Sequence, residues 1–142
     1  MNTVLSVIKR KGIAPVTISP DETVIEALRI MEEKNIGSVV VMQNESYLGI
    51  MTERDYSRKV ILKNKDSAHT KVSEIMTTGL PSVTATDSID HCMQLMGEQN
   101  IRYMPVLESN KLIGIISMSD VVKETILAQK ETINQLQNYI NS

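Results

Sequence analysis

The sequence contains no tryptophan and no phenylalanine, and its four tyrosines are its only aromatic residues. With so few rings, a stacking surface for single-stranded nucleic acid is not expected. The formal net charge of -2 also gives no basic field that would attract a phosphate backbone. We therefore expect no nucleic-acid partner, and a core built from aliphatic side chains and the nine methionines.

Cysteine is also scarce, because Cys92 stands alone and cannot form an internal disulfide. A lone cysteine favours a reducing compartment. No apolar run approaches the roughly 18 residues that span a bilayer, and the N-terminus has no signal-peptide pattern. We expect a cytoplasmic protein without membrane insertion, whose 142 residues suit one domain of ordinary size.

An internal repeat is the strongest feature that is present. When the sequence is shifted by 65 residues along itself, residues 31–55 and 96–120 share eight identities without a gap. Gly49 and Asp55 fall on Gly114 and Asp120, and the apolar positions mostly stay apolar. The chain is therefore expected to hold two copies of one unit. The expected parts are repeat 1 (5–63), a polar linker (64–71), repeat 2 (72–130) and a C-terminal helix extension (131–142).

Each copy has the residue pattern of a β-α-β-β-α unit. The elements expected in the first copy are a short strand at 16–18, a helix that starts near the capping residues 19–22, strands at 36–42 and 47–51, and a helix from Thr52. The second copy repeats them at 82–84, 88–98, 101–107, 111–116 and from Ser119 onward. Since one copy has little core, we expect an α/β (α+β) fold in which two repeats pack sheet to sheet about a pseudo-twofold axis. Gly49 inside a strand indicates a bulge or a close backbone approach.

The first copy, VTISPDETVIEALRIMEEKNIGSVVVMQNESYLGIMTERD, is similar to a CBS repeat. The second copy resembles one more closely, because Pro105 and Val106 follow Arg102. The resemblance covers nearly the whole chain and points to a stand-alone bacterial CBS pair, or Bateman module. It implies a ligand in the cleft between repeats, namely AMP, ADP, ATP, NAD or alternatively S-adenosylmethionine, and assembly as a homodimer.

Both copies contain the motif Gly-x-x-Thr/Ser-x-x-Asp, at residues 49–55 and 114–120. A carboxylate can accept hydrogen bonds from both hydroxyls of a ribose, and a hydroxyl at a helix start can meet a phosphate. The same arrangement is also an ordinary helix cap. The resemblance implies that the motif aspartates, Asp55 and Asp120, bind ribose, and that Thr52 and Ser117 lie near ribose or phosphate.

The first copy is favoured as the occupied one, because Arg54, Arg58 and Lys59 follow its motif and can neutralise phosphate. A solvated charge cluster is the alternative for Arg58 and Lys59. In the second copy Arg102 can reach a phosphate or lie exposed. Family geometry implies that adenine slots between apolar side chains, for each of which core packing is the alternative. The residues expected to line the two clefts are Val16, Thr17, Ile18, Gly37, Ser38 and Val39, and Ser82, Val83, Tyr103 and Met104.

No metal or catalytic centre is expected. His91 and Cys92 are adjacent but lack the further ligands of a metal site, and no required cofactor is indicated. No Ser-His-Asp, HExxH, P-loop or GxGxxG pattern appears, so we do not expect an enzyme. The C-terminal segment has apolar residues at helical spacing, and its part after Gln129 either pairs with a second chain or folds back.

The function that these patterns favour is a non-catalytic regulatory module. It is expected to bind an adenine nucleotide between its repeats and to relay occupancy to an unknown protein partner. The alternative is a structural module for dimerisation or protein interaction that has no physiological ligand.

Overall fold

The computed structural model describes residues 2–141, and the chain divides into two units. Unit 1 joins the N-terminal residues up to Ala14 to the chain from Pro81 onward, while unit 2 contains Pro15–Leu80. Residues 5–14 of the expected first repeat thus lie in unit 1, and residues 72–80 of the expected second repeat lie in unit 2.

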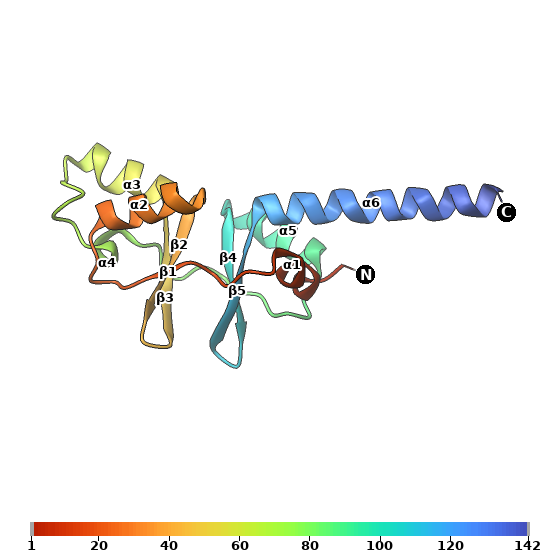
Figure 1. The fold of residues 1–142 in the computed structure, drawn as a ribbon, viewed down its shortest axis with the longest axis horizontal. Helices are drawn as coiled ribbons and strands as arrows, with labels where there is room; N and C mark the ends of the chain where they lie inside the picture. The colour runs from red at the N-terminus through yellow and green to blue at the C-terminus, as the bar shows by residue number, and fades with distance from the viewer. Residues whose placement is uncertain (1, 142) are drawn as a thin grey trace. The chain divides into compact units, whose positions relative to one another are not determined.

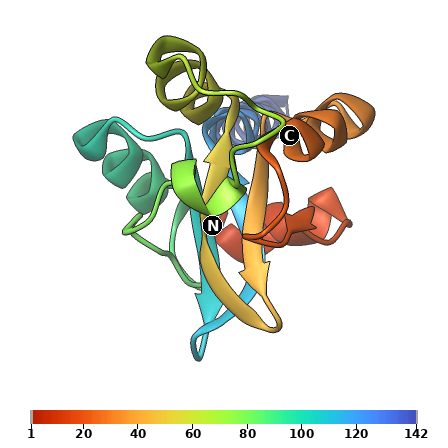
Figure 2. The same ribbon diagram turned by 90° about the vertical axis from the view of Figure 1, so that its left-hand side faces the viewer.

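Unit 2 consists of a three-stranded sheet and the helices around it. Its elements are β1 (Thr17–Ile18), α2 (Val24–Lys34), β2 (Ser38–Gln43), β3 (Ser46–Thr52), α3 (Glu53–Lys59), the 3-10 helix η1 (Ile61–Lys63) and α4 (Val72–Ile75). β1 runs parallel to β2, and β2 and β3 form an antiparallel hairpin with Asn44 at φ 56° in its turn. α2 and α3 gather at the end of the hairpin opposite this turn (Figures 1 and 2).

Unit 1 repeats this plan with a two-stranded sheet and a much longer final helix. Its elements are α1 (Val4–Lys11), α5 (Ile89–Gln99), β4 (Tyr103–Glu108), β5 (Lys111–Ser117) and α6 (Met118–Asn141). β4 and β5 form an antiparallel hairpin, and α6 extends well past α1 and α5 (Figure 1). The predicted mixed α and β fold and the predicted C-terminal helix are confirmed.

The expected first strand of the second copy, at residues 82–84, is reduced to a single parallel bridge between Val83 and Val106. In the first copy the amide of Val40 donates to the carbonyl of Val16 at 2.9 Å and ties the strand to its neighbour. Pro105 stands at the equivalent position of the second copy and has no amide hydrogen. The prediction of a full strand there is wrong because this proline removes a donor from the ladder.

The two helices that precede the hairpins begin and end alike. Thr23 caps α2 and Ser88 caps α5, each by accepting a hydrogen bond from the backbone amide three residues later. Asn35 and Asn100 end them in the left-handed conformation, at φ 54° and 53°, which asparagine tolerates. The first helix therefore starts just after the predicted capping segment, 19–22, and the second starts where it was predicted.

In each unit, backbone hydrogen bonds join the start of the helix before the hairpin to a segment that precedes the β-α-β-β-α pattern of the other unit. The two units use the same pattern, because the repeat residues involved are 65 positions apart. From amide to carbonyl, the bonds are Val72 to Glu22 (2.8 Å) and Val24 to Thr70 (2.8 Å) in unit 2, and Val4 to Asp87 (2.9 Å) and Ile89 to Asn2 (3.4 Å) in unit 1. Each preceding segment is thus part of the unit it completes.

The lone thiol belongs to the aliphatic core of unit 1. Cys92 on α5 has no exposed surface and lies in a cluster with Val4, Val7 and Met96. Burial, and secondly the negative charge of Asp87, raise the pKa of Cys92 to about 11. Ala27 stands at the equivalent position of the first copy and is also fully buried.

We expect Cys92 of the folded protein to react with a thiol reagent at pH 8 at least about 100-fold more slowly than in urea. A pKa near 11 leaves on the order of one thousandth of the group as thiolate, against about a quarter for a free cysteine. Because folding raises this pKa, the contribution to stability is complete below the ordinary cysteine pKa and is lost as the pH rises towards 11. If Cys92 of the native protein is labelled at pH 8 as fast as in urea, the thiol is not buried as described.

Gly49 lies in β3 where the backbone around Thr77 passes close by. Ile50 and Thr77 exchange two backbone hydrogen bonds of 2.8 and 3.1 Å. A Cβ on Gly49 would lie 2.5 Å from the carbonyl oxygen of Thr77, whereas one on Gly114 would meet the Cδ1 of Ile8 at 3.0 Å. The close backbone approach that the sequence predicts at Gly49 is confirmed.

Replacing Gly49 by alanine should lower the free energy of unfolding by about 1–3 kcal/mol, because a backbone carbonyl must move. Gly114→Ala is the matched variant and should cost less, since the end of the Ile8 side chain can rotate away. Urea unfolding of both variants measures the difference. Equal losses, or a larger loss at Gly114, would contradict the assigned role of the Thr77 backbone.

Candidate functional site

The first copy of the motif lies at the junction of β3 and α3. Thr52 caps α3, and its hydroxyl oxygen accepts a hydrogen bond from the amide of Asp55 at 3.1 Å. The Asp55 carboxylate in turn accepts from the amide and the hydroxyl of Thr52, at 3.0 and 3.1 Å. This reciprocal capping box follows from the three-residue spacing, which places both side chains on the first turn of the helix.

Two more donors occupy the second oxygen of the Asp55 carboxylate. The hydroxyl of Thr77 donates to Oδ1 at 2.8 Å, and the Nζ of Lys59 lies 2.9 Å from the same atom. Lys59 also donates to the carbonyl of Ile75 at 2.9 Å. Asp55 is only 6% exposed, so the roughly four acceptor positions of its carboxylate are filled inside unit 2.

The second copy has the same cap at the junction of β5 and α6, with a less crowded carboxylate. Ser117 Oγ accepts from the amide of Asp120 at 3.1 Å, and Asp120 Oδ2 accepts from the amide of Ser117 at 2.9 Å. The Nζ of Lys11 reaches the same Oδ2 at 3.0 Å and also donates to the carbonyl of Ile115 at 3.2 Å. The other oxygen of Asp120, Oδ1, takes no part in these bonds. The Asp120 carboxylate can therefore accept further hydrogen bonds, whereas both oxygens of Asp55 are already engaged.

The cations beside the two aspartates come from different parts of the chain. Four residues after the motif aspartate, the first copy has Lys59 and the second has Glu124. Glu124 is 1% exposed, and Arg10 pairs with it through both terminal guanidinium nitrogens. Helix α1 thus brings two adjacent cations, Arg10 and Lys11, to two acids of α6.

The structure brings several predicted residues of the first copy close to its motif. The amide of Glu53, the first residue of α3, donates to the carbonyl of Gly37 at 3.2 Å. Ser38 is the register partner of Thr52 across the hairpin. Gly37 and Ser38 therefore lie beside the start of α3.

Unit 1 places the equivalent residues in the same way. The amide of Met118, the first residue of α6, donates to the carbonyl of Arg102 at 2.8 Å, and Tyr103 is the register partner of Ser117. Arg102 is exposed and Tyr103 is half-buried. Both lie next to the start of the helix that carries Asp120.

The predicted lining residues on the strands divide between core and surface. Ile18 and Val39 are buried in the core of unit 2, and Val16 packs against that core. Thr17 is exposed, and it lies opposite Val40 in the sheet. For Ile18 and Val39 the structure therefore shows the packing role that was the alternative to ligand contact.

The three predicted phosphate-binding cations of the first copy differ in their surroundings. Arg54 and Arg58 are exposed on α3, where their charges face solvent. Lys59 is held between the Asp55 carboxylate and the carbonyl of Ile75. Two of the three N–H donors of Lys59 are thus engaged within unit 2.

Sequence reasoning missed the residues that complete the two motifs. Thr77 is 22 residues from Asp55, and Lys11 is 109 residues from Asp120, so no local pattern connects them. One signal was available, because Glu124 replaces Lys59 when the repeats are aligned. An acid in place of the neighbouring lysine indicates that the second copy takes its cations from elsewhere.

The two histidines do not form a metal centre. His69 forms a side-chain hydrogen bond with Asp66 in the exposed loop before α4. This hydrogen bond is the largest of the contributions that lower the pKa of Asp66. His91 lies on α5 next to the buried Cys92. Within residues 2–141, no group of three or more histidine, cysteine, aspartate and glutamate side chains is placed to hold a metal ion.

Arg10→Met should lower the free energy of unfolding by about 3 kcal/mol, because it leaves the buried carboxylate of Glu124 without its cationic partner. The double variant Arg10→Met, Glu124→Met should recover most of this loss, since apolar side chains then replace the pair. Lys9→Met, on an exposed position of α1, is the control. If chemical denaturation gives Arg10→Met and Lys9→Met the same stability, the ion pair does not hold α1 in place.

The fold and the motifs together define a class of protein. Each unit has a hairpin followed by a helix, and an aspartate at the start of that helix is fixed by a capping hydroxyl and a lysine. The CBS domain model matches the chain twice, at residues 8–61 and 72–126. The chain belongs to the CBS domain family.

Individual relatives extend the match over most of the chain. The CBS domain-containing protein CBSX3, mitochondrial, of Arabidopsis thaliana is 35% identical over 97% of this chain and 71% of its own length. A protein with CBS domains from Burkholderia ambifaria MC40-6 is 41% identical, with a TM-score of 0.85 over 90% of this chain and 96% of its own. ATU1752 from Agrobacterium tumefaciens is 36% identical, with a TM-score of 0.81 over 86% and 98%. These matches confirm the resemblance to stand-alone CBS-pair proteins.

No helix among the described residues is both long enough and apolar enough to cross a membrane.

Proposed function

We propose that this protein is a non-catalytic regulatory module that binds an adenine nucleotide through its ribose and reports occupancy to a protein partner. The observation that carries this proposal is the carboxylate of Asp120. It is fixed at the start of α6 by Ser117 and Lys11, and one of its oxygens lies outside these bonds. A fixed carboxylate with acceptor capacity suits a ribose, whose 2′ and 3′ hydroxyls are neighbouring donors.

Asp55 is less suited to the same task. Its carboxylate already accepts from Thr52, Thr77 and Lys59. A ribose would have to replace one of these donors, and the displaced buried group would need another partner. We therefore assign the ribose to Asp120, although the exposed Arg54 and Arg58 make the first copy the richer in cations.

The rest of the nucleotide has suitable neighbours around the start of α6. Arg102 is exposed beside Met118, where a guanidinium can pair with phosphate oxygens. Tyr103 and Ser117 face one another across the hairpin and offer a ring and a hydroxyl. This set contains groups for the sugar, the phosphate and the base, and it fits AMP, ADP, ATP or NAD.

The contacts of Asp120 also suggest how occupancy is relayed. Lys11 of α1 bridges Asp120 and the carbonyl of Ile115, so a ligand that engages this carboxylate alters the forces that hold α1. A ligand shifts such an equilibrium only by the difference between its affinities for the two states. In this proposal α1 has a tighter and a looser attachment, and the partner binds one of them.

Two relatives support a regulatory role of this kind. The inosine-5'-monophosphate dehydrogenase of Methanocaldococcus jannaschii is 33% identical over 110 residues, which are 21% of its length. A pair of this kind is thus a minor part of a larger enzyme. The CBS domain pair of MJ0100, a likeness of fold alone at 23% identity and a TM-score of 0.78, is in complex with 5'-methylthioadenosine and S-adenosyl-L-methionine.

At least one of AMP, ADP, ATP, NAD and S-adenosylmethionine should raise the melting temperature of the protein at millimolar concentration. At 100 times Kd the added stability is about 2.7 kcal/mol, which corresponds to roughly 5–10 °C for a chain of this size. Asp120→Asn retains an acceptor for the cap but loses the charge, and it should at least halve the rise. Asp55→Asn is the matched variant and should keep it.

The ribose itself provides a control for this experiment. Adenosine should raise the melting temperature, whereas 2′,3′-dideoxyadenosine, which lacks both hydroxyls, should not. If none of the five ligands stabilises the protein, the nucleotide proposal fails. If the ligand raises the melting temperature of Asp120→Asn as much as that of the wild type, the ribose does not bind at Asp120.

A further inference from the structure

An apolar stripe on α6 remains exposed in unit 1. Its members follow one another at alternating spacings of four and three residues, and their aliphatic side chains are between 46% exposed, at Ile126, and 77% exposed, at Ile140. The six positions, which we call the α6 seam, are Val122, Ile126, Gln129, Ile133, Leu136 and Ile140.

The α6 seam differs from the face by which α6 packs on its own unit. That face is marked by Val121 and Glu124, which are buried, and by Ala128, which is half-buried. The alternating spacing of the seam is the heptad pattern of a coiled coil, with the three isoleucines at position a and Leu136 at position d. The helix therefore has one face for its own unit and a second for another helix.

The end of α6 needs such a second surface. All residues from 129 to 141 are exposed, and Figure 1 shows this part of the helix extending past α1 and α5. An isolated helical segment of this length is marginal in water, since propensity alone rarely offsets nucleation. Packing of the α6 seam against another helix would stabilise it.

We propose that the α6 seam pairs with the α6 seam of a second copy of this chain in a parallel, two-stranded coiled coil. Isoleucine at a and leucine at d favour two parallel strands. Gln129 is the one polar member of the α6 seam, and in a parallel pair it meets Gln129 of the second copy, where the two amides can hydrogen-bond. In an antiparallel pair it would face Ile133, without a polar partner.

The charges beside the α6 seam agree with the parallel arrangement. An antiparallel pair would place Lys130 against Lys130 of the second copy, where like charges repel. A parallel pair instead places Lys130 of the second copy beside Thr125, because positions g and e then face one another.

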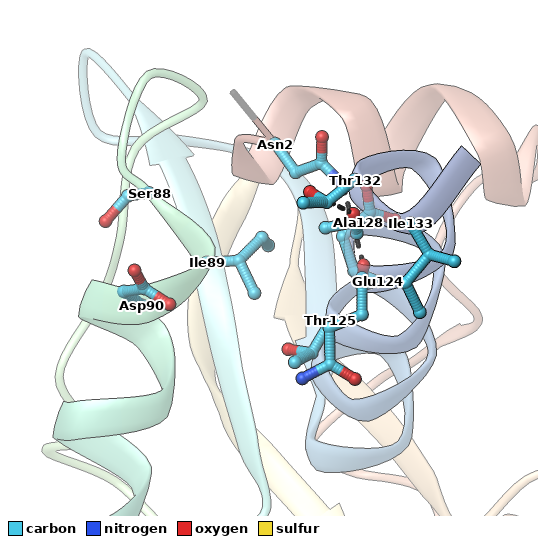
Figure 3. A pocket seen from close by; sticks show the side chains of 10 residues that line it. Asn2, Ser88, Ile89, Asp90, Glu124, Thr125, Ala128, Thr132 and Ile133 are labelled. Carbon is cyan, nitrogen blue, oxygen red and sulfur yellow. Dashed lines mark hydrogen bonds between the residues drawn. The ribbon is translucent and has the colours of Figure 1, made fainter. Parts of the chain in front are cut away.

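A groove adjoins the α6 seam, and its lining includes the acid Asp90, for which no ion pair is found among residues 2–141. It measures about 480 Å³, lies between α6 and the start of α5, and shares Gln129 and Ile133 with the α6 seam. Thr125 lines it together with Asp90, an exposed acid of α5, and Glu124 in its wall is already paired with Arg10. Lys130 of the second copy therefore enters a site of opposite charge. Figure 3 shows the α6 wall and the facing wall with Ser88, Ile89 and Asp90.

The contact is large enough for specific association. An aliphatic side chain removes about 60–120 Å² from water when it is fully buried. Six side chains from each helix then remove on the order of 1,000 Å², which is near the lower limit of specific interfaces. The proposal uses residues of α6 and its groove, so it does not depend on nucleotide binding.

Sedimentation equilibrium of the full chain without nucleotide tests the α6 seam. The wild type should sediment at twice its 15.9 kDa chain mass. Ile133→Asp should raise the dissociation constant at least tenfold, because a charge would enter the seam. Gln135→Asp adds the same charge to the same turn outside the α6 seam and should leave association unchanged. Ile133 is 53% exposed and lies outside the core, so circular dichroism should show both variants folded.

A disulfide tests the orientation. In a parallel pair the two copies of Ile140→Cys lie side by side and should form a disulfide under mild oxidation, whereas an antiparallel pair separates them by about 27 Å. The wild type, whose Cys92 is buried, is the control. A monomeric wild type, or unchanged association of Ile133→Asp, would overturn the α6 seam as the interface. Absence of the disulfide in a dimer would overturn its parallel direction.

Discussion

A carboxylate at the start of a helix constrains both units of this protein. Asp55 and Asp120 have little contact with solvent, and an ionised group in such a place costs several kcal/mol if it lacks partners. Unit 2 supplies the partners from nearby, with Lys59 on the same helix and Thr77 on the adjoining strand segment. Unit 1 takes its lysine from α1, at the other end of the chain. The ion pair of Lys11 with Asp120 thus adds to the backbone hydrogen bonds that attach α1 to unit 1.

The same constraint is met in a different way in each of the two copies. In the first copy the residue four positions after the aspartate is Lys59, and donors from unit 2 occupy both oxygens of the Asp55 carboxylate. Where that residue is an acid, Glu124, two cations must come from α1, and the aspartate keeps an oxygen outside these contacts. The two copies of the motif therefore differ in how many acceptor positions of the aspartate are occupied within the chain.

Much of the fold could be predicted from the sequence because its determinants are local. The repeat, the hairpins and the helix starts at Thr52 and Ser88 depend on residues within a few positions of one another. The lost strand at 82–84 depends on the missing amide of Pro105, which matters only once the strand pairing is known. The partners of the motif aspartates were not predictable from spacing, because Thr77 and Lys11 approach only in the folded chain. The sequence is enough to locate the motif in both copies. The difference between the two aspartates becomes visible only in the hydrogen bonds of the folded chain.

The most direct test of the central claim observes the two carboxylates themselves. Carbon-13 spectra can follow the side-chain carboxyl signals of Asp55 and Asp120 while AMP is added to the folded protein. The Asp120 signal should shift with a saturable dependence on the AMP concentration, while the Asp55 signal should keep its chemical shift. A saturable shift at Asp55 with an unchanged Asp120 would contradict the central claim.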